Sequence, residues 1–158
     1  MLEELDGRPA AEAYADATGL RLDDLNGPTL AHHPLGFPFR GRPFVCSPVK
    51  RVKERALELA NTVHPGDELQ LLHPGDLAGS TRESLENAIR SFEMEHGVPA
   101  AGALFFNCLG RYLDARYSNC VEELGEALTQ LPVAGFNTLG EQLGAMHTNH
   151  TLTGLLFG

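Results

Sequence analysis

Apolar residues in the second half of the chain recur with helical spacing in two places. The longer stripe has apolar positions three or four residues apart, at Leu85, Ala88, Ile89 and Phe92. This spacing predicts one face of a helix, with a capping box of Ser80 and Glu83 near its start and Gly97 at its end. A shorter stripe predicts a second helix that begins at Asn119. Its apolar positions are Val121, Leu124 and Leu128.

Two continuous apolar runs flank the shorter stripe, at 100–108 and 132–138. Such runs are expected of strands covered on both faces. Residues 145–157 predict a last strand, and GRYLDARYS between the runs predicts a loop. A helix between consecutive strands commonly makes them parallel, so that both strands end at the same edge of the sheet. Asn107–Arg111 would then lie beside Asn137–Glu141, a convergence that antiparallel strands would not produce.

Prolines and glycines divide the first half into shorter pieces. GRPAAEAYADATGL predicts a helix that ends at Gly19. The prolines of 27–43 remove amide donors and predict a proline-rich meander or edge segment, followed by the extended segments FVCSPVKRV and ALELANTV. The tetrapeptide His-Pro-Gly-Asp, at 64–67 and again at 73–76, indicates turns. These patterns predict a single α+β domain over 1–158, with a mixed, partly antiparallel β-sheet flanked by about three α-helices.

Charge and composition narrow the function classes. The chain of 158 residues has a formal charge of −9 and a pI of about 5.1, which argues against nucleic acid as a partner because that binding depends on clustered Lys and Arg. The sequence shows no apolar run long enough to cross a bilayer and no signal peptide, so no membrane association is expected. Three cysteines without a C-x-x-C motif favour a reducing, cytoplasmic setting.

Arg111 and Glu141 are the candidate charges of a ligand site at the predicted sheet edge. Arg can hold a carboxylate through two parallel hydrogen bonds and Glu can hold an ammonium, so the two together suit an amino acid. Neutral hydrogen-bonding groups would come from Asn107, Thr138, Asn149 or Thr151. Two alternatives stay open: Arg111 and Glu141 pair only with each other, or Glu141 is an exposed turn residue.

A metal site and a cysteine hydrolase are further alternatives. His147 and His150 are three residues apart, but such side chains point to opposite faces of a strand. No third ligand stands at a recognised spacing, so neither a metal nor a cofactor is expected. Cys108 with His147 and Glu141 supplies the residue types of a nucleophile, a base and an orienting group. A cysteine in an apolar strand, however, is more often inert core packing. Gly140 is expected to permit a left-handed turn.

Several stretches, taken in order, resemble the C-terminal domain of FIST proteins, which are bacterial signal-transduction sensors. They are GRPAAEAYADATG near the start, HPLG at 33–36, the strand ALFFNCLGR, and PVAGFNTLGEQLG followed by HTNHTLTGLLF. The most specific part is the Cys-x-Gly-Arg stretch from Cys108 to Arg111, followed by Pro-x-x-Gly-Phe and Gly-Glu, with Asn and Thr in the last strand. The resemblance covers nearly the whole chain, from Leu5 to the end.

The resemblance implies a cytoplasmic sensory module that binds a small ligand such as an amino acid. It also implies an N-terminal companion domain and output proteins such as histidine kinases, diguanylate cyclases or chemoreceptors. No companion domain precedes position 1, which predicts an excised fragment or a shortened relative. His150, between the Asn and the Thr of the last motif, departs from the family pattern. The site residues that the resemblance carries over are Cys108, Arg111, Gly135, Gly140, Glu141, Asn149 and Thr151.

We therefore predict a sensory domain that is not an enzyme and has no catalytic residues. The alternative is a structural, dimerisation or protein-interaction domain without a small ligand, and a homodimer is a further expectation. The less favoured hydrolase requires a histidine within hydrogen-bond reach of the Cys108 sulfur. A pocket where the two charges converge favours the sensor, and an exposed apolar patch favours the interaction domain. The predicted ligand-binding residues are Asn107, Cys108, Arg111, Thr138, Gly140, Glu141, Asn149 and Thr151.

Overall fold

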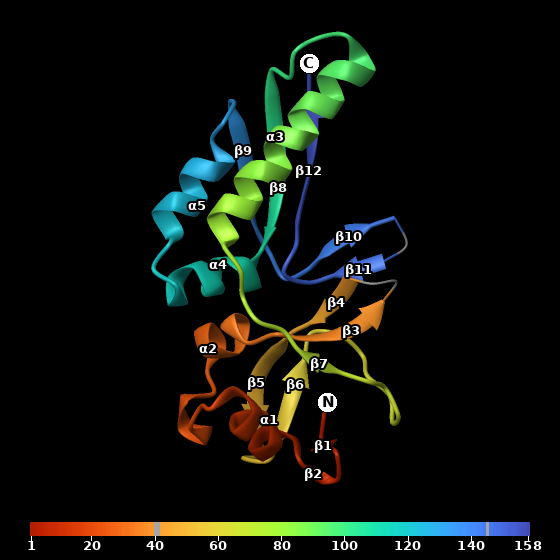
Figure 1. Ribbon diagram of the computed structural model, residues 1–158, viewed down its shortest axis with the longest axis vertical. Coiled ribbons are helices and arrows are strands. Elements are labelled where there is room, and N and C mark those ends of the chain that lie inside the picture. The colour runs from red at the N-terminus through yellow and green to blue at the C-terminus, as the bar shows by residue number, and fades with distance from the viewer. Residues whose placement is uncertain (40–41, 145) are drawn as a thin grey trace. The chain divides into compact units, whose positions relative to one another are not determined.

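The computed structural model describes residues 1–39, 42–144 and 146–158. These residues form two compact units, Met1–Pro74 and Gly75–Gly158 (Figure 1). Helices and strands occur in both, and the strands pair in parallel and antiparallel fashion, so the α+β class is confirmed. Arg40 and Gly41 of the proline-rich segment and Ala145 of the predicted last strand lie outside the described residues.

The first unit combines small antiparallel sheets with short helices. Its helices are α1 (Ala10–Thr18), the 3-10 helix η1 (Leu22–Asp24) and α2 (Gly27–His32). Its strands are β1 (Glu4–Leu5), β2 (Arg8–Pro9), β3 (Leu35–Phe39), β4 (Arg42–Cys46), β5 (Pro48–Val52), β6 (Ala56–Leu59) and β7 (Gln70–Leu71). They pair in the orders β1-β2, β4-β3-β7 and β5-β6. The helix predicted to end at Gly19 is confirmed, because Gly19 caps α1 in a left-handed conformation that glycine adopts without strain.

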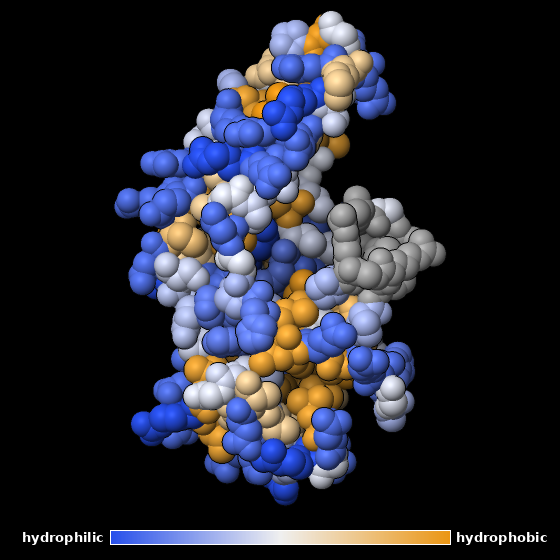
Figure 2. Space-filling view, viewed as in Figure 1, coloured by the Kyte–Doolittle hydropathy of each residue, from blue (hydrophilic) through white to orange (hydrophobic). Residues whose placement is uncertain are grey.

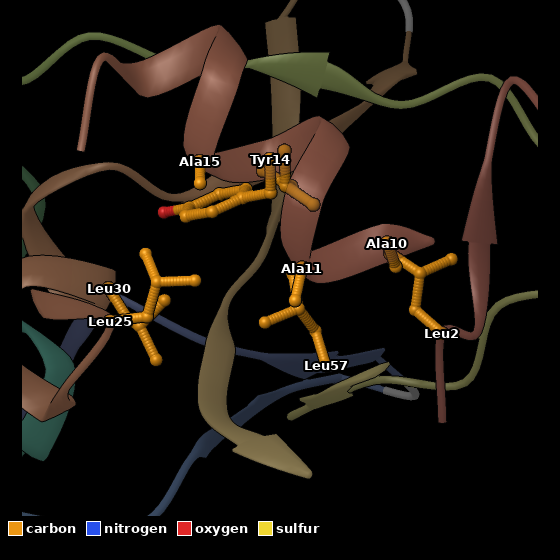
Figure 3. Packing of buried hydrophobic residues seen from close by; sticks show 9 residues of the cluster. Leu2, Ala10, Ala11, Tyr14, Ala15, Leu25, Leu30 and Leu57 are labelled. Carbon is orange, nitrogen blue, oxygen red and sulfur yellow. The ribbon is translucent and has the colours of Figure 1, made fainter. Parts of the chain in front are cut away.

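The core of the first unit forms around one face of α1 (Figure 3). Ala11 and Tyr14 of this helix are buried together with Leu30 of α2 and Leu57 of β6. The Tyr14 hydroxyl donates to the carbonyl of His33 at 2.5 Å, so the polar end of the ring has a partner inside the core. Burial raises the pKa of Tyr14.

The described residues of 27–43 form a helix and a hairpin in place of the predicted meander. Pro28 lies in the first turn of α2, where its missing amide removes no helical hydrogen bond. Asn26 caps this helix together with Thr29 in a capping box. Pro38 and Pro43 face each other across β3 and β4. The prolines therefore punctuate regular structure here instead of preventing it.

The second unit is built on a three-stranded mixed sheet of order β12-β8-β9. Its helices are α3 (Leu77–His96), α4 (Leu109–Tyr117) and α5 (Val121–Leu128). Its strands are β8 (Gly102–Cys108), β9 (Val133–Thr138), β10 (Glu141–Leu143), β11 (Met146–Thr148) and β12 (Leu152–Phe157). β8 and β9 are parallel, as the helical crossover predicted, and Asn107 is paired with Asn137. β12 runs antiparallel to β8, and β10 with β11 forms a separate hairpin.

Helices α3 and α5 cover one face of the mixed sheet (Figure 1). On that face Ala103 and Phe105 of β8 pack with Leu85 of α3 in a buried cluster. Hydrophilic residues dominate the outer sides of α3 and α5 in Figure 2. On the opposite face of the sheet large side chains stay exposed, with 62% of Phe136 and 56% of Leu155 accessible. The prediction that 132–138 is covered on both faces is therefore wrong.

Two helix predictions for the second unit need correction. α3 begins at Leu77, because the Asp76 side chain accepts a hydrogen bond from the Gly79 amide at 2.8 Å, so the capping box at Ser80 and Glu83 is wrong. Its predicted end is confirmed, with Gly97 in a left-handed cap. The predicted loop after β8 is α4.

The last predicted strand is divided into β11 and β12 by a turn. Residues 149–151 form this turn, in which His150 has a φ of 54°. Within the described ranges, none of the helices combines the length and the apolar character needed to span a bilayer.

Candidate functional site

The junction of β8 and α4 positions three of the predicted site residues. Asn107 and Cys108 end β8 and are both buried, and the chain continues directly into α4 at Leu109. Arg111 therefore lies on a helix, four residues after Asn107, a separation that brings the two side chains together. Nε of Arg111 donates to Oδ1 of Asn107 at 3.0 Å.

The side chains of Asn107 and Arg111 join four elements. Nδ2 of Asn107 donates to Oδ1 of Asn137 on β9 at 2.9 Å. Nη2 of Arg111 donates to Oγ1 of Thr81 on α3 at 2.6 Å. The Thr81 hydroxyl in turn donates to the Leu77 carbonyl at 2.6 Å. The guanidinium is thus held between α3, α4 and β8 by neutral partners.

Glu141, the first residue of β10, is the second charge at this edge of the sheet, and it is only 4% exposed. Its Oε1 accepts from the Thr138 hydroxyl, and its Oε2 accepts from the Thr151 hydroxyl at 2.5 Å. The Thr138 hydroxyl also lies 3.3 Å from the Asn107 carbonyl oxygen, which connects the carboxylate to the arginine cluster. Thr148 donates to the Glu141 backbone carbonyl at 3.2 Å. We call Thr81, Asn107, Arg111, Asn137, Thr138, Glu141 and Thr151 the polar network.

Arg111 and Glu141 share the polar network without pairing with each other. In the part of the chain that the structure describes, neither has an oppositely charged group within 4.0 Å. A guanidinium has five N–H donors, and among the described residues only Nε and Nη2 of Arg111 have a protein acceptor. Burial lowers the pKa of Arg111, and Cys108, Asp114 and Glu141 oppose that shift. The geometry thus shows neither a simple ion pair nor an exposed turn glutamate.

His150 borders the network on the side of α4. A Cβ atom built on Gly110 would stand 2.5 Å from Nε2 of His150, so the ring lies directly against the glycine. Among the described residues, Nε2 is buried without a hydrogen-bond partner. Burial lowers the pKa of His150 to about 4, Arg111 adds to the shift, and Asp114 and Glu141 oppose it. The imidazole is therefore neutral at pH 7.

Comparison with protein families identifies the chain. A sequence profile of the FIST C domain matches residues 10–143. The chain belongs to the FIST C domain family. The matched residues lie in both compact units, and the expectation of one domain over 1–158 stays a prediction. No curated protein and no solved structure matches the chain. Membership in this family assigns the protein to signal transduction as a sensory domain.

Two of the glycines that the FIST resemblance implied have backbone roles. A Cβ atom on Gly135 would stand 2.3 Å from the Phe105 carbonyl oxygen, so a side chain there would disturb the pairing of β8 with β9. Gly140 has a φ of 148°, and a Cβ atom there would stand 2.2 Å from Nε2 of His147. Gly140 therefore shapes the turn that delivers Glu141, as the expected positive-φ turn residue.

Besides these two glycines, Cys108 and Asn149 are the predicted FIST residues that lie outside the polar network. Cys108 is a buried free thiol, and Asn149 is buried in the turn before β12. No described histidine forms a hydrogen bond with the Cys108 sulfur, so the geometry that the hydrolase alternative requires is not present. The described residues also contain no group of three His, Cys, Asp or Glu side chains able to hold a metal ion.

Two grooves border the mixed sheet of this FIST C domain. The first, of about 370 Å³, is lined by α5 and β9 and reaches Asn107 and Asn137. The second, of about 500 Å³, is lined by α3 and β12. Arg111 and Glu141 line neither of them. The first groove therefore meets the polar network at the asparagine pair.

Sequence reasoning missed two polar residues beside the predicted site. Thr81 lies four residues before Leu85, on the buried side of α3, and this helical spacing was the signal that could have found it. Asp114, also buried, lies three residues after Arg111 on α4. The stretch GRYLDARYS, residues 110–118, predicts a loop, so the helical periodicity there was not used.

Proposed function

We propose that this FIST C domain senses a small zwitterion, an amino acid or a close relative, at the polar network. The observation that carries the proposal is that one cation and one anion share the network without pairing. Arg111 keeps N–H donors for a ligand carboxylate, and the Glu141 carboxylate has lone pairs beyond those used by two hydroxyls. An amino acid carries the two matching groups.

Desolvation supports the same proposal. A charge withdrawn from water is costly unless an opposite charge and hydrogen bonds compensate for it. Glu141 is buried, its carboxylate partners among the described residues are the hydroxyls of Thr138 and Thr151, and burial disfavours the charged form of Arg111. A ligand with its ammonium on Glu141 and its carboxylate on Arg111 would compensate for both.

The contacts of Arg111 suggest how binding would be signalled. A ligand carboxylate at the guanidinium would replace a neutral partner, either Thr81 of α3 or Asn107 of β8. A ligand shifts a conformational equilibrium only through its different affinity for the two states, and exchange of the contact to α3 supplies such a difference. We propose that the change is passed, in the cytoplasm, to an N-terminal FIST companion domain and to output proteins such as kinases or cyclases.

A thermal-shift screen of free amino acids tests the proposal. Ligand at 100 times its Kd stabilises the native state by about 2.7 kcal/mol, which raises Tm by roughly 5–10 °C in a chain of this size. Each hit is then compared with its amide, which lacks the carboxylate, and with its N-acetyl form, which lacks the ammonium. We expect both analogues to bind at least tenfold more weakly.

Variants connect each end of the ligand to one side chain. Arg111→Ala should abolish the preference for the free acid over the amide, and Glu141→Gln should abolish the preference for the free amine. Arg116→Ala is the matched control, because Arg116 lies on the same helix but is exposed. Binding that persists unchanged in Arg111→Ala and Glu141→Gln would contradict the proposed site.

A protein-interaction domain without a small ligand is the second candidate. It is favoured by the exposed apolar side chains of Phe136, Leu155 and Phe157 on the open face of the mixed sheet. Apolar surface that is exposed in a single patch commonly marks an interaction site. A screen without any hit would favour this candidate over the sensor.

A further inference from the structure

Strand β12 is an edge strand with an open hydrogen-bonding side. In the part of the chain that the structure describes, β8 is the one strand that pairs with it. The Cys108 amide donates to the Thr151 carbonyl at 3.0 Å, which fixes the phase of the antiparallel ladder. Because the ladder alternates, Leu152, Gly154 and Leu156 turn their amides and carbonyls away from β8. Such an edge is a template for another strand.

The groove of about 500 Å³ runs beside this edge, on the helical face of the sheet. Its α3 wall is formed by the exposed flank of the helix that carries Ser84, Ala88 and Ser91. Its floor includes Phe92 and Leu156, which are only half-buried. Helix α5 packs against α3 and covers β9, so it leaves this flank free (Figure 1). This flank of α3 therefore carries short side chains, has an apolar base and lies next to the unpaired edge of β12.

We propose that the occupant of this edge and groove is a second copy of the chain. Strand β12 pairs antiparallel with β12 of the second copy about a two-fold axis near Gly154. The two three-stranded sheets become one six-stranded sheet. The α3 helix of each copy then fills the groove of the other.

The spacing of the elements fits this arrangement. Neighbouring strands are about 4.8 Å apart, so a helix lying over β8 and β12 is about 5 Å from the two-fold axis. The two α3 helices would then be about 10 Å apart, the usual distance of packed helices. Ser84, Ala88 and Ser91 on this flank are small, so no large side chain obstructs the approach of the two helices to that distance. An extended peptide that paired with β12 would not require short side chains on the flank of α3.

The groove is also centred in a way that suits two-fold symmetry. It is lined from Ser84 to His96 on α3 and from Leu152 to Leu156 on β12. The β12 range is centred at Gly154, near the middle of the strand, and the α3 range is centred close to Arg90, in the C-terminal half of the helix. A two-fold axis at Gly154 therefore places the same stretch of α3 from both copies side by side and antiparallel, as an isologous contact requires.

The size of the contact predicts a weak dimer. A strip about 25 Å long and about 20 Å wide, one strand edge plus one helix flank, buries about 500 Å² on each copy. The total of about 1,000 Å² is at the lower limit for a specific interface, so we expect a Kd in the micromolar range. Each copy carries a charge of −9, and screening of this repulsion should make the dimer tighter at higher salt.

Sedimentation equilibrium of the whole chain tests the proposal. The wild type should change from monomer to dimer as its concentration rises to about 100 μM. Ala88→Arg places a long charged side chain where the two helices meet, and it should weaken dimerisation at least tenfold. Glu86→Arg is the matched control, because residue 86 is exposed and projects from the opposite side of α3. Circular dichroism should show that both variants remain folded.

Two results would overturn the proposal. One is a wild-type chain that stays monomeric at about 100 μM, which would leave an extended peptide as the occupant of the edge. The other is a dimer that Ala88→Arg and Glu86→Arg affect equally. Concentration-dependent dimerisation that Ala88→Arg alone abolishes would establish the contact.

Discussion

The buried imidazole of His150 should make the stability of this FIST C domain depend on pH. Its Nε2 has no hydrogen-bond partner among the described residues and lies against Gly110, and burial lowers the pKa of His150 to about 4. In the unfolded chain the same group titrates at about 6.5. The unfolded state therefore binds the proton first, so stability is full above pH 6.5 and is lost as pH falls toward 4.

The two pKa values set the size of the effect. Linkage gives a loss of about 2 kcal/mol between pH 7 and pH 5 for a group that shifts from 6.5 to about 4. Because His150 as a whole residue is only half-buried, solvent screening reduces this to roughly 1–2 kcal/mol. The difference is well above the error of a urea titration.

Urea unfolding at pH 7 and pH 5 measures the loss. His150→Asn removes the titrating ring and retains a residue that tolerates the positive φ at this position. The wild type should lose roughly 1–2 kcal/mol more than His150→Asn between the two pH values. His64→Asn is the control, because the His64 side chain is 74% exposed. A His150 ring resonance that titrates near pH 6.5, or equal losses in the wild type and in His150→Asn, would refute the reasoning.

Three further predictions concern stability, each measured as a free energy of unfolding. Gly135→Ala should cost more than about 2 kcal/mol, because its Cβ atom would meet the Phe105 carbonyl oxygen, whereas Gly125→Ala on α5 has free space and should be neutral or stabilising by up to about 1 kcal/mol. Asp76→Ala removes the side-chain cap of α3 and should cost about 1 kcal/mol; no loss would mean that the cap has a substitute. Leu57→Ala, in the core of the first unit, should cost about 2–5 kcal/mol, and a smaller cost would mean that the cavity collapses.

The spacing of apolar residues predicted the helices and strands that bury a continuous apolar stripe. The spacing of Leu85, Ile89 and Phe92 gave α3, and the apolar run that ends at Asn107 gave β8. The crossover rule then placed Asn107 beside Asn137, which the parallel register confirms. These predictions needed only local pattern and chain topology.

The predictions that the structure corrects concern features that depend on residues far apart in the sequence. Helix α4 was missed because Gly110 and three charged residues stand among its apolar positions, and Arg111 is satisfied by Asn107 and by Thr81, a residue thirty positions earlier. The cap of α3 was predicted at Ser80 instead of Asp76 because both are good capping residues, and only the backbone path selects one of them. The exposure of Phe136 depends on which face the helices cover, and an apolar run does not reveal that.

The second His-Pro-Gly-Asp sequence, at 73–76, gives the chain a natural place to be divided. Its Pro74 closes the first compact unit and its Asp76 caps the first helix of the second. A fragment that starts at Gly75 would keep the cap, whereas one that starts at Leu77 would lose it. Expression of 75–158 by itself would therefore place the whole polar network, with β12 and α3, on about half of the polypeptide. The tetrapeptide thus marks where a minimal sensor could be cut from its chain.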